Sequence, residues 1–274
     1  MRPRRDARRD GLAGVCRHVA YLGPPRTLAE LLFDPPHSLQ HQCWAPSDMR
    51  GGGAVNVDGF GAGWYRTGYS APVRYRRAVP MWTDLGFAAV AQVTSSGAVL
   101  AAVRSATVGM PVMDTACAPF ADGPWLFSHN GKLPGWPGSA EPLARTLPPA
   151  ELYTLDAPTD SALLWAMVRH RLRAGFTLAD AITEVVLAAA GAVPGARLNF
   201  LLTDGATVAA SAWTHSLSVR LSGGVLSVCS EPTDAGAGWQ AVADRHLVVA
   251  DRSTFDIRPL PIETAEPIKT AETP

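Results

Sequence analysis

Residues 16–23 read CRHVAYLG, a stretch in which polar and apolar residues alternate well enough for a short strand, and Pro24 and Pro25 follow directly. Alternation of this kind is typical of a short β-strand, because successive side chains of a strand point to opposite faces. Proline ends such a segment, since it lacks the backbone N–H that a strand ladder uses. The sequence therefore predicts a strand that has a cysteine, Cys16, at its start.

The fifteen residues before Cys16 differ in composition from the rest of the chain. They carry five arginines and two aspartates, a formal charge of +3, whereas the other 259 residues sum to −3. Val15 is what a GTG start codon encodes when it is translated as an internal codon, and initiation there gives Met-Cys-Arg-His. Methionine is readily removed ahead of a small residue, which leaves Cys16 as the N-terminus. Residues 1–15 are therefore expected to be a non-native or removed leader; self-cleavage of a propeptide and an intact leader are the alternatives.

The overall composition excludes several classes of protein. Charged residues make up 18 % and balance at 24 against 24, which argues against a general nucleic-acid binder. No apolar run approaches the roughly 18 residues that a membrane-spanning helix needs. The leader lacks the apolar segment of a secretory signal. We therefore expect a cytoplasmic protein with no nucleic-acid and no membrane partner.

Cysteine and histidine spacing gives little sign of a metal site. The four cysteines, Cys16, Cys43, Cys117 and Cys229, form no C-x-x-C pair, which disfavours a zinc ribbon or a thioredoxin-type redox site. His37 and His41 would share a face only if a helix followed Pro35 and Pro36. We expect neither a metal nor a cofactor.

The remaining pattern predicts one α+β domain over residues 16–260 and a loose Pro- and Thr-rich tail over 261–274. The clearest helices are predicted at 160–173 and 178–190, where apolar residues recur at helical spacing. Thr27 is expected to cap a short helix that ends at Leu32. Strands are predicted at 60–66, 73–77, 99–104, 125–128, 198–202, 208–213, 217–221, 225–228 and 247–250.

An N-terminal cysteine combines a nucleophile and a base in one residue. Its α-amino group has a reference pKa of about 7.7–8.0, against about 8.5 for the thiol. The amine can therefore accept the proton of the Cys16 thiol near neutral pH without a separate histidine.

His129, Asn130 and Gly131 follow the strand predicted at 125–128, and Asn-Gly is a strong turn dipeptide. The sequence predicts a tight turn that exposes the Asn130 side-chain amide and the Gly131 N–H. Both groups could stabilise an oxyanion that forms when a nucleophile attacks an amide.

Two further residues could hold the acyl part of a substrate. Arg104 ends a predicted strand, where its guanidinium could fork the two oxygens of a carboxylate, and Thr107 could add a hydroxyl donor. Asp160 begins a predicted helix, where its carboxylate either caps the helix or binds an ammonium group.

In their order along the chain these residues resemble the class II glutamine amidotransferases, a branch of the N-terminal-nucleophile hydrolases. The matching features are Cys16, the R-x-x-T-x-G of residues 104–109, the H-N-G of residues 129–131 and the Asp160-Ser161 pair. The stretches DGFGAGWY (58–65), AAVRSATVGMP (101–111), APF (118–120), LFSHNGKL (126–133) and SEPTD (230–234) are similar to one subgroup. That subgroup comprises the γ-glutamyl hydrolases of ergothioneine biosynthesis, which remove glutamate from γ-glutamyl-hercynylcysteine sulfoxide.

The resemblance implies a four-layer αββα sandwich in which Cys16 attacks the γ-glutamyl carbonyl and a thioester is then hydrolysed. It implies that Asn130 and Gly131 form the oxyanion hole. Glutamate would be bound by Arg104, Thr107, His129 and Asp160. The chain departs from many amidotransferases at Ala118 and Ala162, where those have histidine and glutamate.

Four questions stay open at this point. The substrate could be glutamine, as for a general glutaminase or an amidotransferase subunit, although 259 residues suffice only for the amidase part. The protein could also bind a ligand without catalysis, with Cys16 internal and inert. If the leaving group carries a trimethylammonium, Trp64, Trp82 or Trp125 could line its side of the site. The oligomeric state is not indicated.

Overall fold

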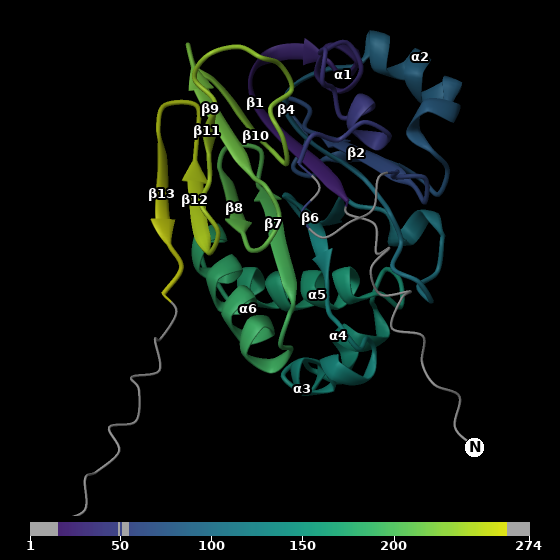
Figure 1. The fold of residues 1–274 in the computed structure, drawn as a ribbon, viewed down its shortest axis with the longest axis vertical. Helices are drawn as coiled ribbons and strands as arrows, with labels where there is room; N and C mark the ends of the chain where they lie inside the picture. Colours follow the sequence, from purple (N-terminus) through teal and green to yellow (C-terminus); the bar gives the residue numbers. More distant parts are fainter. Residues whose placement is uncertain (1–15, 49, 51–54, 262–274) are drawn as a thin grey trace, which may run out of the picture.

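The computed structural model describes residues 16–48, 50 and 55–261, and within them two antiparallel sheets lie at the centre of the fold (Figure 1). The leader predicted at residues 1–15 and all of the predicted tail except Pro261 lie outside the described residues. The seven-stranded sheet has the order β11-β9-β10-β1-β4-β2-β3, and the six-stranded sheet has the order β13-β12-β8-β7-β6-β5.

The strands of the larger sheet are β1 (Arg17–Thr27), β2 (Phe60–Trp64), β3 (Val73–Arg77), β4 (Ser95–Val103), β9 (Ser218–Ser222), β10 (Val225–Cys229) and β11 (Gln240–Ala241). Those of the smaller sheet are β5 (Phe120–Asp122), β6 (Trp125–Lys132), β7 (Arg197–Thr203), β8 (Val208–Ala212), β12 (His246–Ala250) and β13 (Phe255–Pro259). The helices are α1 (Leu28–Leu32), α2 (Leu85–Val93), α3 (Glu141–Ala144), α4 (Pro149–Tyr153), α5 (Asp160–Arg173) and α6 (Leu178–Ala192).

Side-chain alternation in the strands produces three core clusters and hence four layers. In β1, Val19 and Tyr21 pack with α1 and α2, whereas Ala20 and Leu22 belong to the cluster that fills the space between the sheets. The outer face of the smaller sheet packs against α5 and α6, with Phe127 of β6 in that cluster. Figure 1 shows α1 and α2 at the upper right of the view and α5 and α6 at the bottom. The predicted αββα sandwich is confirmed.

Local capping explains where several helices begin. Thr27 and Glu30 form a capping box at the start of α1, as the sequence predicts for Thr27. Thr159 caps α5, because its side chain accepts a hydrogen bond from the backbone N–H of Ala162. Asp160 is therefore the first residue inside the helix, and the capping role considered for its carboxylate is wrong.

The tight turn predicted at His129, Asn130 and Gly131 is also wrong. These residues continue strand β6, where they pair in register with Phe200, Asn199 and Leu198 of β7. The ladder to β7 overrides the local turn preference of the Asn-Gly dipeptide. The side chains of β6 therefore continue to alternate between the two faces of the sheet through these residues.

In the described part of the chain, no helix is both long and apolar enough to cross a bilayer. No group of three or more histidine, cysteine or acidic side chains in those residues is arranged to hold a metal ion. The His37 and His41 rings lie together, with their Nδ1 atoms 3.2 Å apart.

Candidate active site

Cys16 lies immediately before β1, at the edge of a small cavity of about 20 Å³. Arg104, Ser128, His129 and Ser161 are among the other residues that line this cavity. The Cys16 Sγ atom lies 3.7 Å from the backbone oxygen of Ser105, to which the thiol donates. The structure thus brings Cys16, Arg104 and His129 together from three distant parts of the sequence.

The alternation of β1 and β6 places the polar residues of the site in the space between the sheets. Ala20 and Leu22 face this space, so Cys16 and His18 belong to the same side of β1. On β6, Leu126 faces the same space, which puts Ser128 and Asn130 on that side. The His18 Nδ1 atom lies 3.2 Å from the Ser128 hydroxyl, so the two strands meet directly behind Cys16.

The Cys16 thiol is held in its protonated form. Burial raises its pKa, and the hydrogen bond to Ser105 and the charge of Arg104 offset this effect only in part. His18 is a poor base for it, because burial and the neighbouring His129 lower the pKa of His18 to about 3. A nucleophilic Cys16 therefore needs another base, such as its own α-amine.

Asn130 is fully buried, and neither atom of its side-chain amide has a hydrogen-bond partner among the described residues. Leaving such a group unpaired is costly, so a buried unpaired amide points to a missing partner. Gly131 follows on β6, and a Cβ atom at this position would lie 1.9 Å from the backbone oxygen of Arg197. Only glycine therefore allows β6 and β7 to approach so closely beside Asn130.

Arg104 directly follows β4 and is largely buried, with 9 % of the residue exposed. Its Nη1 atom donates to the backbone oxygen of Pro111 at 2.9 Å, which draws the loop from 105 to 111 back over the arginine. Arginine has five N–H donors, so this bond leaves others for a carboxylate ligand. Thr107 lies on the same loop but lines a neighbouring groove rather than the Cys16 cavity.

Asp160 and His129 are tied together through Ser161. The carboxylate of Asp160 accepts hydrogen bonds from the backbone N–H of Ser161 at 2.7 Å and of Leu133 at 2.9 Å. The His129 Nε2–H donates to the Arg197 carbonyl at 2.8 Å, so its Nδ1 accepts from the Ser161 hydroxyl at 2.9 Å. Burial lowers the pKa of His129, which keeps the imidazole neutral in this arrangement.

Sequence reasoning missed the ion pair that fixes the strand behind Cys16. Arg17 is fully buried, and it pairs with Glu231 at 3.0 Å and donates to the backbone oxygens of Cys16 and Asp48. Glu231 also accepts from the backbone N–H of Asp48 and contacts His37 at 2.7 Å. The signal available in the sequence was the SEPTD stretch, which contains Glu231 but gives no indication of its partner.

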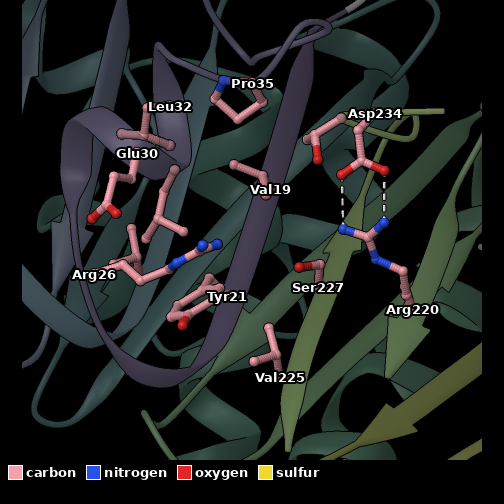
Figure 2. A pocket seen from close by; sticks show the side chains of 13 residues that line it. Val19, Tyr21, Arg26, Glu30, Leu32, Pro35, Arg220, Val225, Ser227 and Asp234 are labelled. Atoms are coloured by element: carbon pink, nitrogen blue, oxygen red, sulfur yellow. Dashed lines mark hydrogen bonds and ion pairs between the residues drawn. The ribbon is translucent and has the colours of Figure 1, made fainter. Parts of the chain in front are cut away.

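The last acid of that stretch, Asp234, forms a second ion pair on the outer face of the larger sheet. Figure 2 shows Arg220 of β9 forking the two oxygens of Asp234, at 2.6 and 2.9 Å. The pair borders a cavity lined by Val19 and Tyr21, the side of β1 opposite to Cys16. Arg220 also stacks on Trp239 at 4.3 Å. Asp234 therefore anchors the segment between β10 and β11 and does not belong to the Cys16 site.

The three tryptophans expected near a leaving group lie elsewhere. Trp64 and Trp82 pack into the cluster beside α1 and α2, and Trp125 packs against the cluster beside α5 and α6. None of the three lines the Cys16 cavity or the groove that contains Thr107. The tryptophan that lines this groove is Trp136.

Comparisons with known proteins identify the family of the chain. The family model of the class II glutamine amidotransferases matches residues 30–222. A protein of Mycolicibacterium smegmatis named gamma-glutamyl-hercynylcysteine sulfoxide hydrolase is 40 % identical over 248 residues, which cover 90 % of this chain and 100 % of that protein. The hydrolase of the same name from Mycobacterium tuberculosis is 39 % identical, over 85 % of this chain and 92 % of its own length.

Solved structures with low sequence identity show the same fold. A class II glutamine aminotransferase domain protein from Silicibacter pomeroyi is 24 % identical, with a TM-score of 0.61 over 89 % of this chain and 99 % of that chain. A structure described as the allosteric regulatory enzyme of purine biosynthesis has a TM-score of 0.64 at 16 % identity, covering 89 % of this chain and 49 % of its own. The chain belongs to the class II glutamine amidotransferase family.

Proposed function

We propose that this protein hydrolyses the γ-glutamyl amide bond of γ-glutamyl-hercynylcysteine sulfoxide and releases glutamate, as a cytoplasmic enzyme of ergothioneine biosynthesis. The observation that carries the proposal is the 40 % identity to a hydrolase of that name over the whole of its length. The cavity lined by both Cys16 and Arg104 supports the proposal, because it places a thiol beside a guanidinium that could bind a carboxylate.

In the first half of the reaction, the α-amine of an N-terminal Cys16 accepts the thiol proton as Sγ attacks the γ-glutamyl carbonyl carbon. The oxyanion that forms is stabilised by the Asn130 amide and the Gly131 N–H. The amine then returns the proton to the leaving nitrogen as the C–N bond breaks. The products of this half are a Cys16 thioester and the free amine of the leaving group.

In the second half, a water molecule attacks the thioester carbonyl carbon. The same α-amine accepts a proton from the water, and the same donors stabilise the second oxyanion. The C–S bond breaks, Sγ regains its proton, and glutamate leaves. No redox cofactor or metal is needed for any of these steps.

We assign the glutamyl part to Arg104, Asp160, Thr107 and His129, of which Arg104 and His129 line the cavity. Arg104 binds its α-carboxylate with the N–H donors that Pro111 leaves open, and Asp160 binds its α-ammonium. Thr107 adds a donor from the neighbouring loop. His129 supports this arrangement through Ser161, whose backbone N–H also fixes the Asp160 carboxylate.

Replacing Asn130 by alanine is expected to lower kcat by about 10²–10³ with a much smaller effect on KM, because the amide acts mainly on the transition state. Steady-state kinetics with a γ-glutamyl thioether sulfoxide measure both constants. The buried Asn199, whose amide is fully used by backbone groups at 213–216, is the matched control for a folding effect. An Asn130→Ala enzyme with an unchanged kcat would remove Asn130 from the oxyanion hole.

Substrate choice separates the proposal from the main alternative, a general glutaminase or amidotransferase subunit. We expect kcat/KM for a γ-glutamyl thioether sulfoxide to exceed that for glutamine by at least about tenfold, since only the former presents a large leaving group. Initial rates of glutamate release from the two substrates give the ratio. A preference for glutamine would favour the glutaminase, and substrate binding without turnover would favour a non-enzymatic ligand-binding protein.

A further inference from the structure

An open cavity of about 500 Å³ lies beside the candidate active site and is lined by none of the residues assigned above to the glutamyl group or the oxyanion. Its walls come from residues 216–218, which lead into β9, and from residues between 230 and 235, which follow β10. His37 and Asp48 contribute from the segments after α1. A volume of this size is typical of sites that hold small molecules.

In the larger sheet, this cavity and the Cys16 cavity lie on opposite sides of β1. The strand order places β1 between β4 and β10. Arg104, which follows β4, lines the Cys16 cavity, whereas Ser230, which follows β10, lines the other one. The Ser230 N–H donates to the His18 carbonyl at 2.9 Å, so the pairing of β1 with β10 continues toward Cys16. The second cavity therefore begins one strand spacing, about 5 Å, from the strand that follows Cys16.

The smaller sheet separates the two cavities in the same way. Phe120 of β5 lines the Cys16 cavity, and β6, which carries Asn130, lies between β5 and β7. On β7, Asn199 is paired directly with Asn130, and its side-chain amide donates to the Ser216 carbonyl at 3.3 Å. Ser216 in turn lines the second cavity. The proposed oxyanion donor Asn130 therefore lies between the two cavities.

A γ-glutamyl amide that is attacked by Cys16 extends in two directions from its scissile bond. In a planar trans amide, the acyl chain and the substituent on nitrogen point to opposite sides. Contacts of the glutamyl group with Arg104 place the acyl chain on the β4 side, so the leaving amine extends toward β10 and the second cavity. In a cysteine sulfoxide, two carbons separate the scissile nitrogen from the sulfur, so the sulfoxide oxygen can reach about one strand spacing away.

The acidic side chains of this cavity have cationic partners. Within the described residues, each acid that lines the cavity forms an ion pair with an arginine, in the pairs Glu231–Arg17, Asp234–Arg220 and Asp48–Arg50. Arg50 also lines the cavity, so its charge is offset by Asp48. This compensation favours a ligand group that is polar but carries no net charge.

Two serine hydroxyls supply donors for such a group. Ser216 and Ser218 line the cavity, with only 8 % and 7 % of each residue exposed. In the part of the chain that the structure describes, neither hydroxyl has a hydrogen-bond partner. Leaving a largely buried hydroxyl unpaired is costly, so both are suited to donate to a ligand. A sulfoxide oxygen, which accepts hydrogen bonds but donates none, fits two such donors.

We propose that this cavity binds the leaving amine and that Ser216 and Ser218, here called the serine subsite, donate hydrogen bonds from their hydroxyls to its sulfoxide oxygen. This inference rests on the proposed function and deepens it, because it names the residues that select a sulfoxide over the corresponding thioether. Glutamine makes no use of the serine subsite, since its leaving group is ammonia.

The test compares two substrates that differ only in the sulfoxide oxygen: γ-glutamyl-S-methylcysteine sulfoxide, taken as the faster of its two sulfur epimers, and γ-glutamyl-S-methylcysteine. One hydrogen bond between neutral groups is worth about 2- to 12-fold, so two should give a preference for the sulfoxide of about 10- to 100-fold in kcat/KM. In the double variant Ser216→Ala, Ser218→Ala the ratio should fall to within about threefold of one. Each single variant should give an intermediate ratio.

The ratio of two kcat/KM values in one preparation does not depend on the fraction of folded enzyme, so a destabilised variant remains informative. Ser227→Ala is the matched control, because Ser227 of β10 lines the small cavity shown in Figure 2, on the side of β1 opposite to Cys16. Its ratio should equal that of the unmodified protein.

The outcomes separate this inference from the proposed function. Equal hydrolysis of both substrates, or a preference for the sulfoxide that survives in the double variant or is lost equally in Ser227→Ala, overturns the serine subsite and leaves the γ-glutamyl hydrolase intact. Hydrolysis of neither substrate by the unmodified protein overturns the proposed function, and the serine subsite with it.

Discussion

Cys16→Ala is expected to abolish hydrolysis of a γ-glutamyl substrate, with a fall in kcat of at least about 10⁴, because no other group can form the thioester. Substrate binding should persist, since the proposed contacts to glutamate come from Arg104 and Asp160. Loss of turnover with retained affinity distinguishes a missing nucleophile from a damaged fold. Glutamate release and isothermal titration of the substrate measure the two properties separately.

Cys43→Ala is the matched control for this experiment. Cys43 is fully buried in the cluster beside α1 and α2, where burial raises the pKa of its thiol to about 12. Such a thiol is inert near neutral pH. Its removal should leave kcat unchanged. Comparable turnover by Cys16→Ala and the unmodified protein would show that Cys16 is not the nucleophile.

Protein that retains residues 1–15 is expected to be inactive, with turnover reduced by at least about 10³ relative to protein that begins at Cys16. In the longer form the nitrogen of Cys16 belongs to a peptide bond and cannot accept a proton. The thiol cannot compensate, because burial raises its pKa, and His18, with a pKa of about 3, is a poor base. With residues 1–15 attached, Cys16 therefore has no free α-amine to act as the base.

The comparison requires two purified forms at equal concentration, one expressed from a start codon at position 15 and one from Met1. Intact mass must establish that each form keeps its intended N-terminus during the assay. Thermal unfolding of both forms serves as the control for folding, because the predicted difference lies in chemistry rather than stability.

Several helices and strands could be predicted from the sequence, because the local preferences of their residues agree with the structure that they adopt. The strand at Val73–Arg77 and the helix at Asp160–Arg173 have the predicted bounds. Thr27 caps its helix as expected, since a threonine followed by Glu30 satisfies the first N–H groups without tertiary contacts. The αββα arrangement itself came from the resemblance to a family rather than from these local patterns.

The failure at Asn130 and Gly131 has a tertiary cause. Asn-Gly favours a turn in isolation, but here both residues are paired with β7, which lies almost seventy positions later in the chain. Gly131 is needed for the approach of the Arg197 carbonyl and not for a turn. A local rule cannot anticipate a partner strand that only the folded chain supplies.

The contacts that hold the site residues in place could not be predicted either, because they also join residues that are far apart in the sequence. Arg17 reaches Glu231 across more than two hundred positions, and Asn130 lies beside Asn199 only because of the register between β6 and β7. Individual residues such as Cys16 and Arg104 could be singled out by their chemistry. Their neighbours could be found only from the sheet pairings.

The most direct test of the central claim, that Cys16 acts as an N-terminal nucleophile, is N-terminal sequencing and intact mass of the catalytically active protein after reaction with an electrophilic analogue of glutamine. The account predicts that the active species begins at Cys16 and that one equivalent of the analogue is attached to its thiol. Full activity in a species that begins at Met1, or attachment at another residue, would contradict it.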